Sequence, residues 1–582
     1  MNMDVPVVAK VKLDVPSLGE ITGVCFYDQT CQYYGIPYAT VPGRFRRPQP
    51  SPKPWPNNRW DGTKLGAMCP QPPRDFMYIP NPERPWVEPA PVSSTECLNI
   101  NVSVPTPPSV SSGKPIYPVM VFVHGGAFVY GAGSAPIYDG RRLAEISGNL
   151  NIPTIIVTIT YRVGVYGFLA SKEIKEYNAE FNEGGVGNYG LWDQIEALRW
   201  VQEHISAFGG DPARVTFFGQ SAGGVSANVH MLRGEKLFTS AIVQSGLLPV
   251  CGVLSESQYQ VIYNKILTVL GIPEDLSPRD RLRRLLEVDE TALTAALVPV
   301  GVIPVLTLSP CDDHYLIPGK MPSYSSYADF KPPSWCERVM IGDVGHETLI
   351  WNKSFRGYDA AGLVKLTKSF VGDEEKAQKL LDLYHIHAGM DRNETFYRAQ
   401  KFTTDGLFLA VHWAALKANP GMYAYRFDVP SPFDCDFKDQ PHHSLDNVFI
   451  WGLLKDVLPE KQQRISEKMS EAWLRFANGQ EPWERFDVSR SFMVFGPESC
   501  GMRTVEEDAA RGYAIWDEID RLGLMQKFGE LCDELCMRHA EMCDPTIAPK
   551  ALEVGTFEEL GISTGNQPGG LNLGFFRQNG TK

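Results

Sequence analysis

The chain has 582 residues, of which 43% are hydrophobic and 11% aromatic, so it can bury a large core and is not expected to be disordered. Its 55 Lys and Arg residues against 68 Asp and Glu residues give a net charge of −13, which disfavours binding to nucleic acid and to anionic membrane surfaces. Twelve cysteines are too few over this length for a disulfide-dense scaffold.

The N-terminal segment contains no apolar stretch suited to a secretory signal, because Asp4, Lys10, Lys12 and Asp14 interrupt it. Elsewhere no run approaches the roughly 20 apolar residues that a membrane-spanning helix needs. We therefore expect a cytoplasmic protein without a membrane span, or a secreted one if a leader has been removed.

Short apolar runs alternate with amphipathic stretches along most of the chain, which predicts an α/β architecture. Continuously apolar runs are typical of strands that helices cover on both faces of a parallel sheet. The expected strands of this kind span residues 119–123, 155–160, 215–218, 241–243, 339–341 and 423–427.

The first of these strands leads directly into a glycine-rich loop, His124-Gly125-Gly126-Ala127-Phe128. Glycine lets the backbone approach a substrate oxygen closely, so we expect the N–H groups of Gly126, Ala127 and Ala222 to form an oxyanion hole. His124 is a candidate base, but its position beside this loop favours a structural role.

Residues 185–190 read GVGNYG and match the G-x-G-x-x-G pattern ahead of a helix expected over residues 191–207. A dinucleotide site would need a strand leading into the glycines, whereas residues 172–183 are charged and helical in character. We therefore expect a loop packed against the sheet, and no cofactor.

The strand at residues 215–218 is followed by Gly219-Gln220-Ser221-Ala222-Gly223 and by a helical stretch over residues 225–232. A G-x-S-x-G sequence between a strand and a helix is the context of a nucleophile elbow, in which small residues avoid clashes and a helix N-terminus points at the serine. We therefore expect Ser221 to be the nucleophile.

A possible metal-binding cluster lies near the C-terminus, where three cysteines and a histidine recur at helical spacing. One straight helix cannot surround a zinc ion tetrahedrally with four ligands, so we expect a packed helix face with buried thiols and no metal site. The residues of this cluster are Cys532, Cys536, His539 and Cys543.

Further motifs occur in a fixed order: residues 34–39 (YGIPYA), 95–102 (TECLNINV), the glycine-rich loop, 161–164 (YRVG), 167–169 (GFL), 187–194 (GNYGLWDQ), and 208–212 (FGGDP) ahead of the serine motif. In this order they resemble the type-B carboxylesterases, a family that includes carboxylesterases, cholinesterases and certain fungal lipases. The resemblance is strong over about residues 10–250, looser to about 500, and absent in the tail. It implies the α/β-hydrolase fold, with a large, mostly parallel central sheet flanked by helices, and long loop and helical insertions.

The family resemblance also implies a catalytic acid and then a histidine after the serine in chain order. Residues 342–347 (GDVGHE) follow a predicted strand and resemble the acid loop of the family, which implies Glu347 as the acid. Asp343 is the competing carboxylate in this loop.

Residues 440–446 (QPHHSLD) resemble the histidine loop of the family. The spacing to Phe449 and Gly452 fits the family pattern better for His443 than for His442, so the resemblance implies His443 as the base. Ser444 departs from the pattern, which usually has Gly after the histidine, and keeps His442 open as an alternative.

Two departures bear on the substrate. Gln220 precedes the nucleophile where cholinesterases have Glu, so we do not expect choline esters as substrates. Trp86 lies roughly where cholinesterases place a tryptophan that binds cationic substrates, and we interpret Trp86 as part of the lining of the substrate-binding pocket.

Cys69 and Cys97 resemble the first disulfide of the family. We expect the two residues to lie close enough to bridge, with their oxidation set by the compartment.

Because candidate site residues extend from Gly126 to His443, we expect one catalytic domain over residues 1–545, followed by a C-terminal tail over 546–582. The predicted function is a serine carboxylic-ester hydrolase acting on a small-molecule ester or lactone, bulky and apolar or aromatic, in secondary metabolism or detoxification. The alternatives are an acyltransferase with the same acyl-enzyme, and an inactive esterase-like binding protein.

Overall fold

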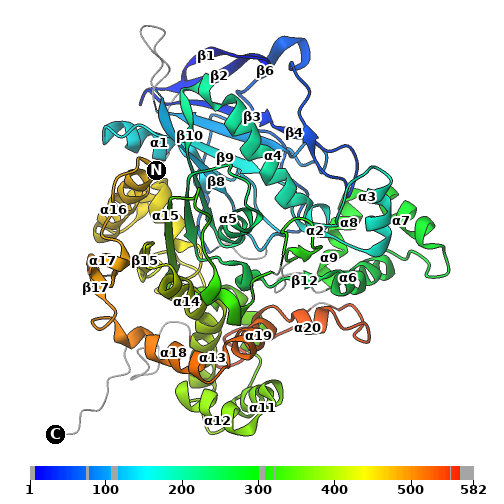
Figure 1. Ribbon diagram of the computed structural model, residues 1–582, viewed down its shortest axis with the longest axis vertical. Coiled ribbons are helices and arrows are strands. Elements are labelled where there is room, and N and C mark those ends of the chain that lie inside the picture. Colours follow the sequence, from blue (N-terminus) through cyan, green and yellow to red (C-terminus); the bar gives the residue numbers. More distant parts are fainter. Residues whose placement is uncertain are drawn as a thin grey trace.

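The computed structural model describes residues 7–73, 78–105, 116–300, 308–319, 321–497, 499–550 and 552–563. Its centre is a 13-stranded sheet of order β1-β2-β3-β7-β9-β8-β10-β11-β14-β15-β16-β17, with β6 paired to β2 (Figure 1). The strands of this sheet are β1 (Val7–Val15), β2 (Gly19–Phe26), β3 (Cys31–Pro37), β6 (Arg59–Asp61), β7 (Asn99–Val104), β8 (Tyr117–Val123), β9 (Ile155–Thr160), β10 (Gly210–Gln220), β11 (Ser240–Gln244), β14 (Arg338–Val344), β15 (Tyr423–Phe427), β16 (Ser491–Phe495) and β17 (Cys500–Thr504).

The middle of the sheet is parallel, from β9 through β8, β10, β11, β14 and β15 to β16. Both ends are antiparallel, through β1, β2, β3 and β7 on one side and β17 on the other. Parallel strands end at the same edge of a sheet, so the segments that follow β8, β10, β14 and β15 gather there. These segments carry the glycine-rich loop, the serine motif, the acid loop and the histidine loop.

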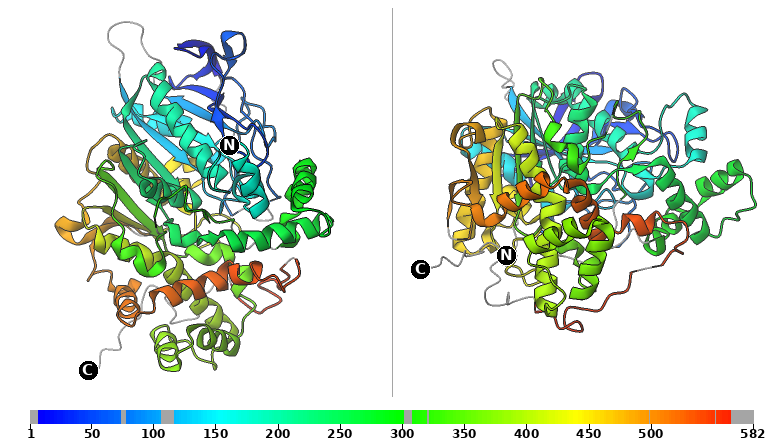
Figure 2. Two further views of the ribbon diagram at one scale, coloured as in Figure 1. Left: turned by 45° about the vertical axis from the view of Figure 1, so that its right-hand side comes forward. Right: turned by 60° about the horizontal axis from the view of Figure 1, so that its bottom comes forward.

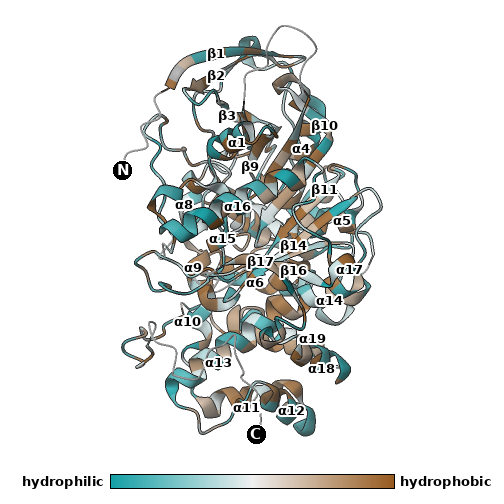
Figure 3. Ribbon diagram, turned by 90° about the vertical axis from the view of Figure 1, so that its left-hand side faces the viewer, coloured by the Kyte–Doolittle hydropathy of each residue, from teal (hydrophilic) through white to brown (hydrophobic). Residues whose placement is uncertain are grey.

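Helices cover both faces of the parallel strands, which explains why these strands are continuously apolar. On β8, Met120 and Phe122 face the cluster formed with α1 (Gly140–Asn149), α15 (Leu445–Trp451) and α16 (Glu460–Ala477). Val119, Val121 and Val123 face the cluster formed with α4 (Tyr189–His204) and α5 (Ala222–Arg233). In Figure 3, brown hydrophobic ribbon is concentrated in the central strands, and teal hydrophilic ribbon runs along peripheral helices such as α8 (Glu290–Ala295).

The helical part of the chain includes a group at the end of the molecule opposite the N-terminal strands, formed by α11, α12, α13, α18 and α19 (Figures 1 and 2). None of the described helices is both long and apolar enough to cross a membrane. The α-helices are α1 (Gly140–Asn149), α2 (Gly164–Phe168), α3 (Lys172–Ala179), α4 (Tyr189–His204), α5 (Ala222–Arg233), α6 (Glu256–Val269), α7 (Pro278–Glu287), α8 (Glu290–Ala295), α9 (Leu297–Val300), α10 (Asn352–Phe355), α11 (Ala360–Val371), α12 (Glu374–Leu383), α13 (Arg392–Thr404), α14 (Ala410–Ala418), α15 (Leu445–Trp451), α16 (Glu460–Ala477), α17 (Phe486–Ser489), α18 (Tyr513–Arg521), α19 (Met525–Cys536) and α20 (His539–Met542).

The expected elements correspond closely to the observed ones. β9 and β15 have the predicted bounds, and the other expected strands lie inside β8, β10, β11 and β14. The stretch before the GVGNYG motif contains helix α3 rather than a strand, and the motif itself leads into α4. In the predicted tail, Tyr397 Oη donates a hydrogen bond to the carbonyl of Ser563 at 2.7 Å, and residues 564–582 lie outside the described part of the chain.

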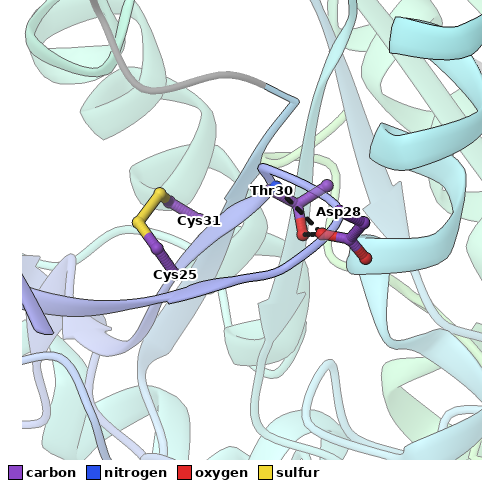
Figure 4. Close-up of a disulfide and its surroundings, with 4 residues drawn as sticks. All are labelled: Cys25, Asp28, Thr30 and Cys31. Atoms are coloured by element: carbon purple, nitrogen blue, oxygen red, sulfur yellow. Dashed lines mark hydrogen bonds between the residues drawn. A yellow bond between two sulfur atoms is a disulfide. The ribbon is translucent and has the colours of Figure 1, made fainter. Parts of the chain in front are cut away.

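The cysteines give one result that the sequence did not indicate. Cys25 and Cys31 are disulfide-bonded as directly paired residues of the β2–β3 hairpin, whose turn is closed by Asp28 and Thr30 (Figure 4). Cys69 and Cys97, expected to lie close enough to bridge, are both buried free thiols in the structure. The two thiols are neighbours, and hydrogen bonding to Cys69, together with burial, raises the pKa of Cys97.

Candidate active site

Ser221 lies in a sharp turn between β10 and α5, as the G-x-S-x-G motif predicts. Its backbone has φ 58° and ψ −124°, outside the regions that most residues adopt, and its N–H donates a hydrogen bond to the carbonyl of Gln244 at 2.8 Å. A Cβ at Gly223 would overlap the carbonyl of Val123, and one at Gly219 would overlap the backbone of Gly223. The two motif glycines are therefore required by close backbone approach.

The acid loop and the histidine loop bring Glu347 and His443 together. Nδ1 of His443 lies 2.5 Å from Oε2 of Glu347, and Oε1 of Glu347 accepts a hydrogen bond from the N–H of Val344 at 2.8 Å. Both side chains are buried, with 3% and 0% of their surface exposed. The carboxylate therefore fixes the ring proton on Nδ1 and leaves Nε2 as a hydrogen-bond acceptor.

The accepting nitrogen of His443 faces the side chain of Gln220, the residue before Ser221. Nε2 of Gln220 lies 3.0 Å from Nε2 of His443, so the amide N–H donates to the imidazole. Among the hydrogen bonds of the described residues, none joins Ser221 to His443. In this resting arrangement the imidazole nitrogen that could take a proton from Ser221 is occupied by Gln220.

The competing candidates have other partners. Asp343 forms an ion pair with Arg511 and lies 3.4 Å from Nδ1 of His412; although burial opposes ionisation, the Arg511 charge holds the pKa of this carboxyl below its usual value. His442 directs Nδ1 to the carbonyl of His443 at 3.0 Å, and burial lowers its pKa to about 4. Among the described contacts, Asp343 does not bind His443 and His442 does not bind a carboxylate.

The glycine-rich loop provides N–H groups near Ser221. Gly126 has φ 111° and Ala127 has φ 55°, so both adopt backbone conformations that favour glycine. Among the described residues, no hydrogen bond uses the N–H of Gly126, Ala127 or Ala222 as a donor. His124 stacks on Tyr161 with ring centroids 4.3 Å apart, in agreement with the expected structural role.

A cavity of about 140 Å³ opens beside Ser221. Most of its wall is aromatic or aliphatic, and amide side chains supply part of the polar surface. The described residues that line it are Tyr78, Ile79, Asn81, Gly126, Ala127, Tyr130, Ile137, Tyr138, Gln220, Ser221, Ile350, Trp351, His442, His443, Ser444 and Asn447.

Trp86, which was expected to line the substrate pocket, is not among the described residues that line this cavity. Its ring packs edge-on against Phe26 at 5.6 Å, and its Nε1 donates a hydrogen bond to Oη of Tyr34 at 3.3 Å. These contacts hold the Trp86 loop against β2 and β3, away from the carboxyl edge of the sheet.

The structure also adds site residues that the sequence reasoning missed. Asp446, three residues after His443, is buried and accepts hydrogen bonds from Gln244 at 3.2 Å and Tyr425 at 3.1 Å. Burial and the nearby Glu347 raise the pKa of Asp446 to about 6. The one signal available in the sequence was its place in the segment that resembles the histidine loop of the family, residues 440–446.

The chain is similar in sequence and in structure to known esterases and lipases. The sequence profile of the carboxylesterase family matches residues 10–509. Para-nitrobenzyl esterase of Bacillus subtilis (strain 168) is 31% identical over 471 residues, covering 78% of this chain and 86% of that protein. Lipase 3 of Yarrowia lipolytica (strain CLIB 122 / E 150) is 28% identical over 478 residues, covering 80% and 87%. A solved structure of PNB esterase superposes with a TM-score of 0.67 and 27% identity, covering 86% of this chain and 99% of that one.

Proposed function

Because the chain belongs to the carboxylesterase family, we propose that it hydrolyses carboxylic esters through an acyl-enzyme formed on Ser221. The observation that carries this proposal is the buried 2.5 Å contact between His443 and Glu347, together with the cavity that both His443 and Ser221 line. An oriented base that lines the same cavity as a serine on a strained turn is the arrangement that activates a hydroxyl nucleophile.

In the proposed mechanism, Oγ of Ser221 attacks the ester carbonyl while Nε2 of His443 takes its proton. Glu347 keeps the other ring proton on Nδ1 and stabilises the imidazolium that forms. The N–H groups of Gly126, Ala127 and Ala222 bind the oxyanion, and one such donor typically contributes about 10²–10³ in rate. His443 then protonates the leaving alcohol, and water hydrolyses the acyl-enzyme with the roles reversed.

The resting contact between Gln220 and His443 adds one step to this mechanism. The amide of Gln220 must leave Nε2 before this nitrogen can accept the proton of Ser221. Substrate entering the cavity displaces Gln220 from the imidazole, and the amide then faces the bound ester. Catalytic hydrogen bonds often tighten only in the complex with substrate, so the resting geometry is compatible with the proposed role.

For the substrate we propose an ester or lactone with a bulky apolar or aromatic group. An apolar cavity of about 150 Å³ is known to bind benzene, so the cavity of about 140 Å³ suits one aromatic ring. The name of the similar para-nitrobenzyl esterase also refers to an aromatic group. We further propose a role in detoxification or secondary metabolism.

The substrate proposal is tested with a panel of p-nitrophenyl and benzyl esters in which the acyl and alcohol halves are varied separately. We expect the highest kcat/KM for esters with one aromatic half and a short second half. A preference for long aliphatic acyl chains would contradict the proposal. Adding an alcohol acceptor and analysing the products would identify an acyltransferase, because that enzyme would form the new ester in preference to the acid.

A further inference from the structure

A π-helix lies directly behind the His443–Glu347 pair. The long helix α13–α14 is interrupted at η7 (Asp405–Leu409), whose five residues form a π-helix and are all buried. A π-helix inside an α-helix amounts to a one-residue insertion, and such insertions are frequent at functional sites. The wider turn rotates the residues that follow it relative to those that precede it.

One side of the π-helix contacts the base. The ring of Phe408 lies 5.4 Å from the imidazole of His443 and is stacked at 5.9 Å on Trp351, which in turn lies 5.9 Å from His443. Phe408 is fully buried and is not among the described residues that line the cavity. It therefore contacts the imidazole from behind and does not contact the bound ester.

The residue preceding the π-helix contacts the acid loop. Oγ1 of Thr404 lies 2.9 Å from Oγ1 of Thr348 and accepts a hydrogen bond from the N–H of Thr348 at 3.3 Å. Thr348 directly follows Glu347. One helix thus holds the acid loop through Thr404 and the base through Phe408, four residues apart.

The π-helix is held in place by contacts with residues other than His443 and Thr348. Asp405 is fully buried and accepts hydrogen bonds from Lys401 at 2.6 Å, Trp516 at 2.8 Å and Tyr384 at 3.0 Å. At Gly406 a Cβ would overlap Sγ of Cys532, so helix α19 packs directly on the backbone of this turn. Neighbouring helices, including α18 and α19, therefore fix the position of the π-helix.

We propose that Phe408, presented by the π-helix Asp405–Leu409, is a positioning residue that holds the His443 imidazole against Glu347. This inference rests on the proposed function. The flat ring limits rotation of the imidazole and excludes water from its hydrogen bond with Glu347. A misplacement of about 1 Å in such a site can reduce the rate about 10²-fold.

The test compares Phe408→Leu with Phe402→Leu in the full-length protein. Phe402 is on the same helix and equally buried, but its ring packs on Tyr384 and Phe528 at 4.9 Å and not on His443. We expect Phe408→Leu to lower kcat at least about tenfold with little change in KM. It should also broaden the far-downfield proton resonance of the His443–Glu347 hydrogen bond. Phe402→Leu should lower the melting temperature similarly and leave both readouts unchanged.

Equal effects of the two variants on kcat and on this resonance would overturn the inference. If Phe408→Leu does not fold, Phe408→Met, which keeps more of the volume but removes the ring, is judged by the same two readouts. An inactive wild-type protein that still shows the downfield resonance would contradict the proposed ester hydrolysis and leave the positioning role standing.

Discussion

The side chain before the nucleophile distinguishes this site from that of the cholinesterases. Gln220 donates a hydrogen bond to Nε2 of His443 at 3.0 Å, and an amide does so without adding charge. A carboxylate at the same distance would instead stabilise the imidazolium form. The residue at this position therefore contacts the base and also forms part of the cavity wall.

We predict that Gln220→Glu moves the acidic limb of the kcat/KM profile to higher pH. An opposite charge this close favours the charged form of a titrating group by about one pH unit or more, so a higher pH is needed to free the base. Gln202→Glu adds the same charge on the half-buried side of α4 and serves as the control. Superimposable profiles for wild type and Gln220→Glu would contradict the assigned contact.

The two adjacent histidines have separate roles in the proposed site. His442 lines the cavity but directs Nδ1 to a backbone carbonyl, whereas His443 contacts Glu347. We predict that His443→Ala abolishes turnover, while His442→Ala retains at least about a tenth of it, because only His443 can act as general base. Steady-state kinetics on a p-nitrophenyl ester measures both, and equal losses would reverse the assignment.

The histidine loop shows how far residue-level prediction reached. The family pattern identified His443, and the structure explains the one departure, because Ser444 adopts the left-handed conformation (φ 70°) that the usual glycine would adopt. Trp86 packs on Phe26 and Tyr34, which its sequence position between two cysteines did not indicate, because that position does not determine whether a loop faces the sheet edge or its N-terminal strands. Such tertiary placement has no local sequence signal.

At the scale of elements, the turn between β10 and α5 depends on close backbone contact. We predict that Gly223→Ala lowers the free energy of unfolding by about 3 kcal/mol, the upper range for overpacking, because the added Cβ overlaps the carbonyl of Val123. Urea unfolding measures the change. Gly501→Ala, where no atom lies within 4 Å of the added Cβ, is the matched control. Equal stability of the two variants would contradict this account of the elbow.

Elements differed in how well the sequence predicted them. The parallel strands were found because both faces are buried and their residues are continuously apolar, as in β9. The antiparallel strand β1 (VVAKVKLDV) alternates apolar and charged residues and was not expected. The π-helix η7 could not be predicted either, since a one-residue insertion leaves no distinct pattern in an apolar helix.

At the scale of the whole molecule, buried neutral histidines connect folding to pH. Burial lowers the pKa of His230 to about 3, with the nearby Arg233 charge acting in the same direction. An unfolded histidine titrates near pH 6.5, so below that pH the unfolded chain binds a proton that the folded chain does not. This group therefore stabilises the fold fully above pH 6.5, and its contribution is lost as the pH falls from 6.5 towards 3.

We predict that His230→Gln removes about 1.4 kcal/mol per pH unit from the slope of stability against pH between 6.5 and 5. The measurement is the free energy of urea unfolding of wild type and variant at several pH values in this range. The wild type should lose more stability than the variant as the pH falls. Parallel curves would contradict the buried neutral state of His230.

For the molecule as a whole, the sequence predicted the fold class correctly but not the disulfide. Ordered motifs implied the α/β-hydrolase fold, because they mark the loops at one edge of a parallel sheet. The Cys25–Cys31 bridge could not be predicted, because the family resemblance implies only Cys69 and Cys97 as a pair, whereas the bonded pair is set by the register of one hairpin. The proposed ester hydrolysis depends on Ser221 as the nucleophile.

The most direct test is labelling with a fluorophosphonate, followed by peptide mass spectrometry. We predict one label per chain on Ser221, and neither labelling nor ester turnover in Ser221→Ala, because only a serine activated by a neighbouring base reacts with such reagents. Absence of labelling in the wild-type protein, or undiminished turnover in Ser221→Ala, would contradict the proposed acyl-enzyme mechanism.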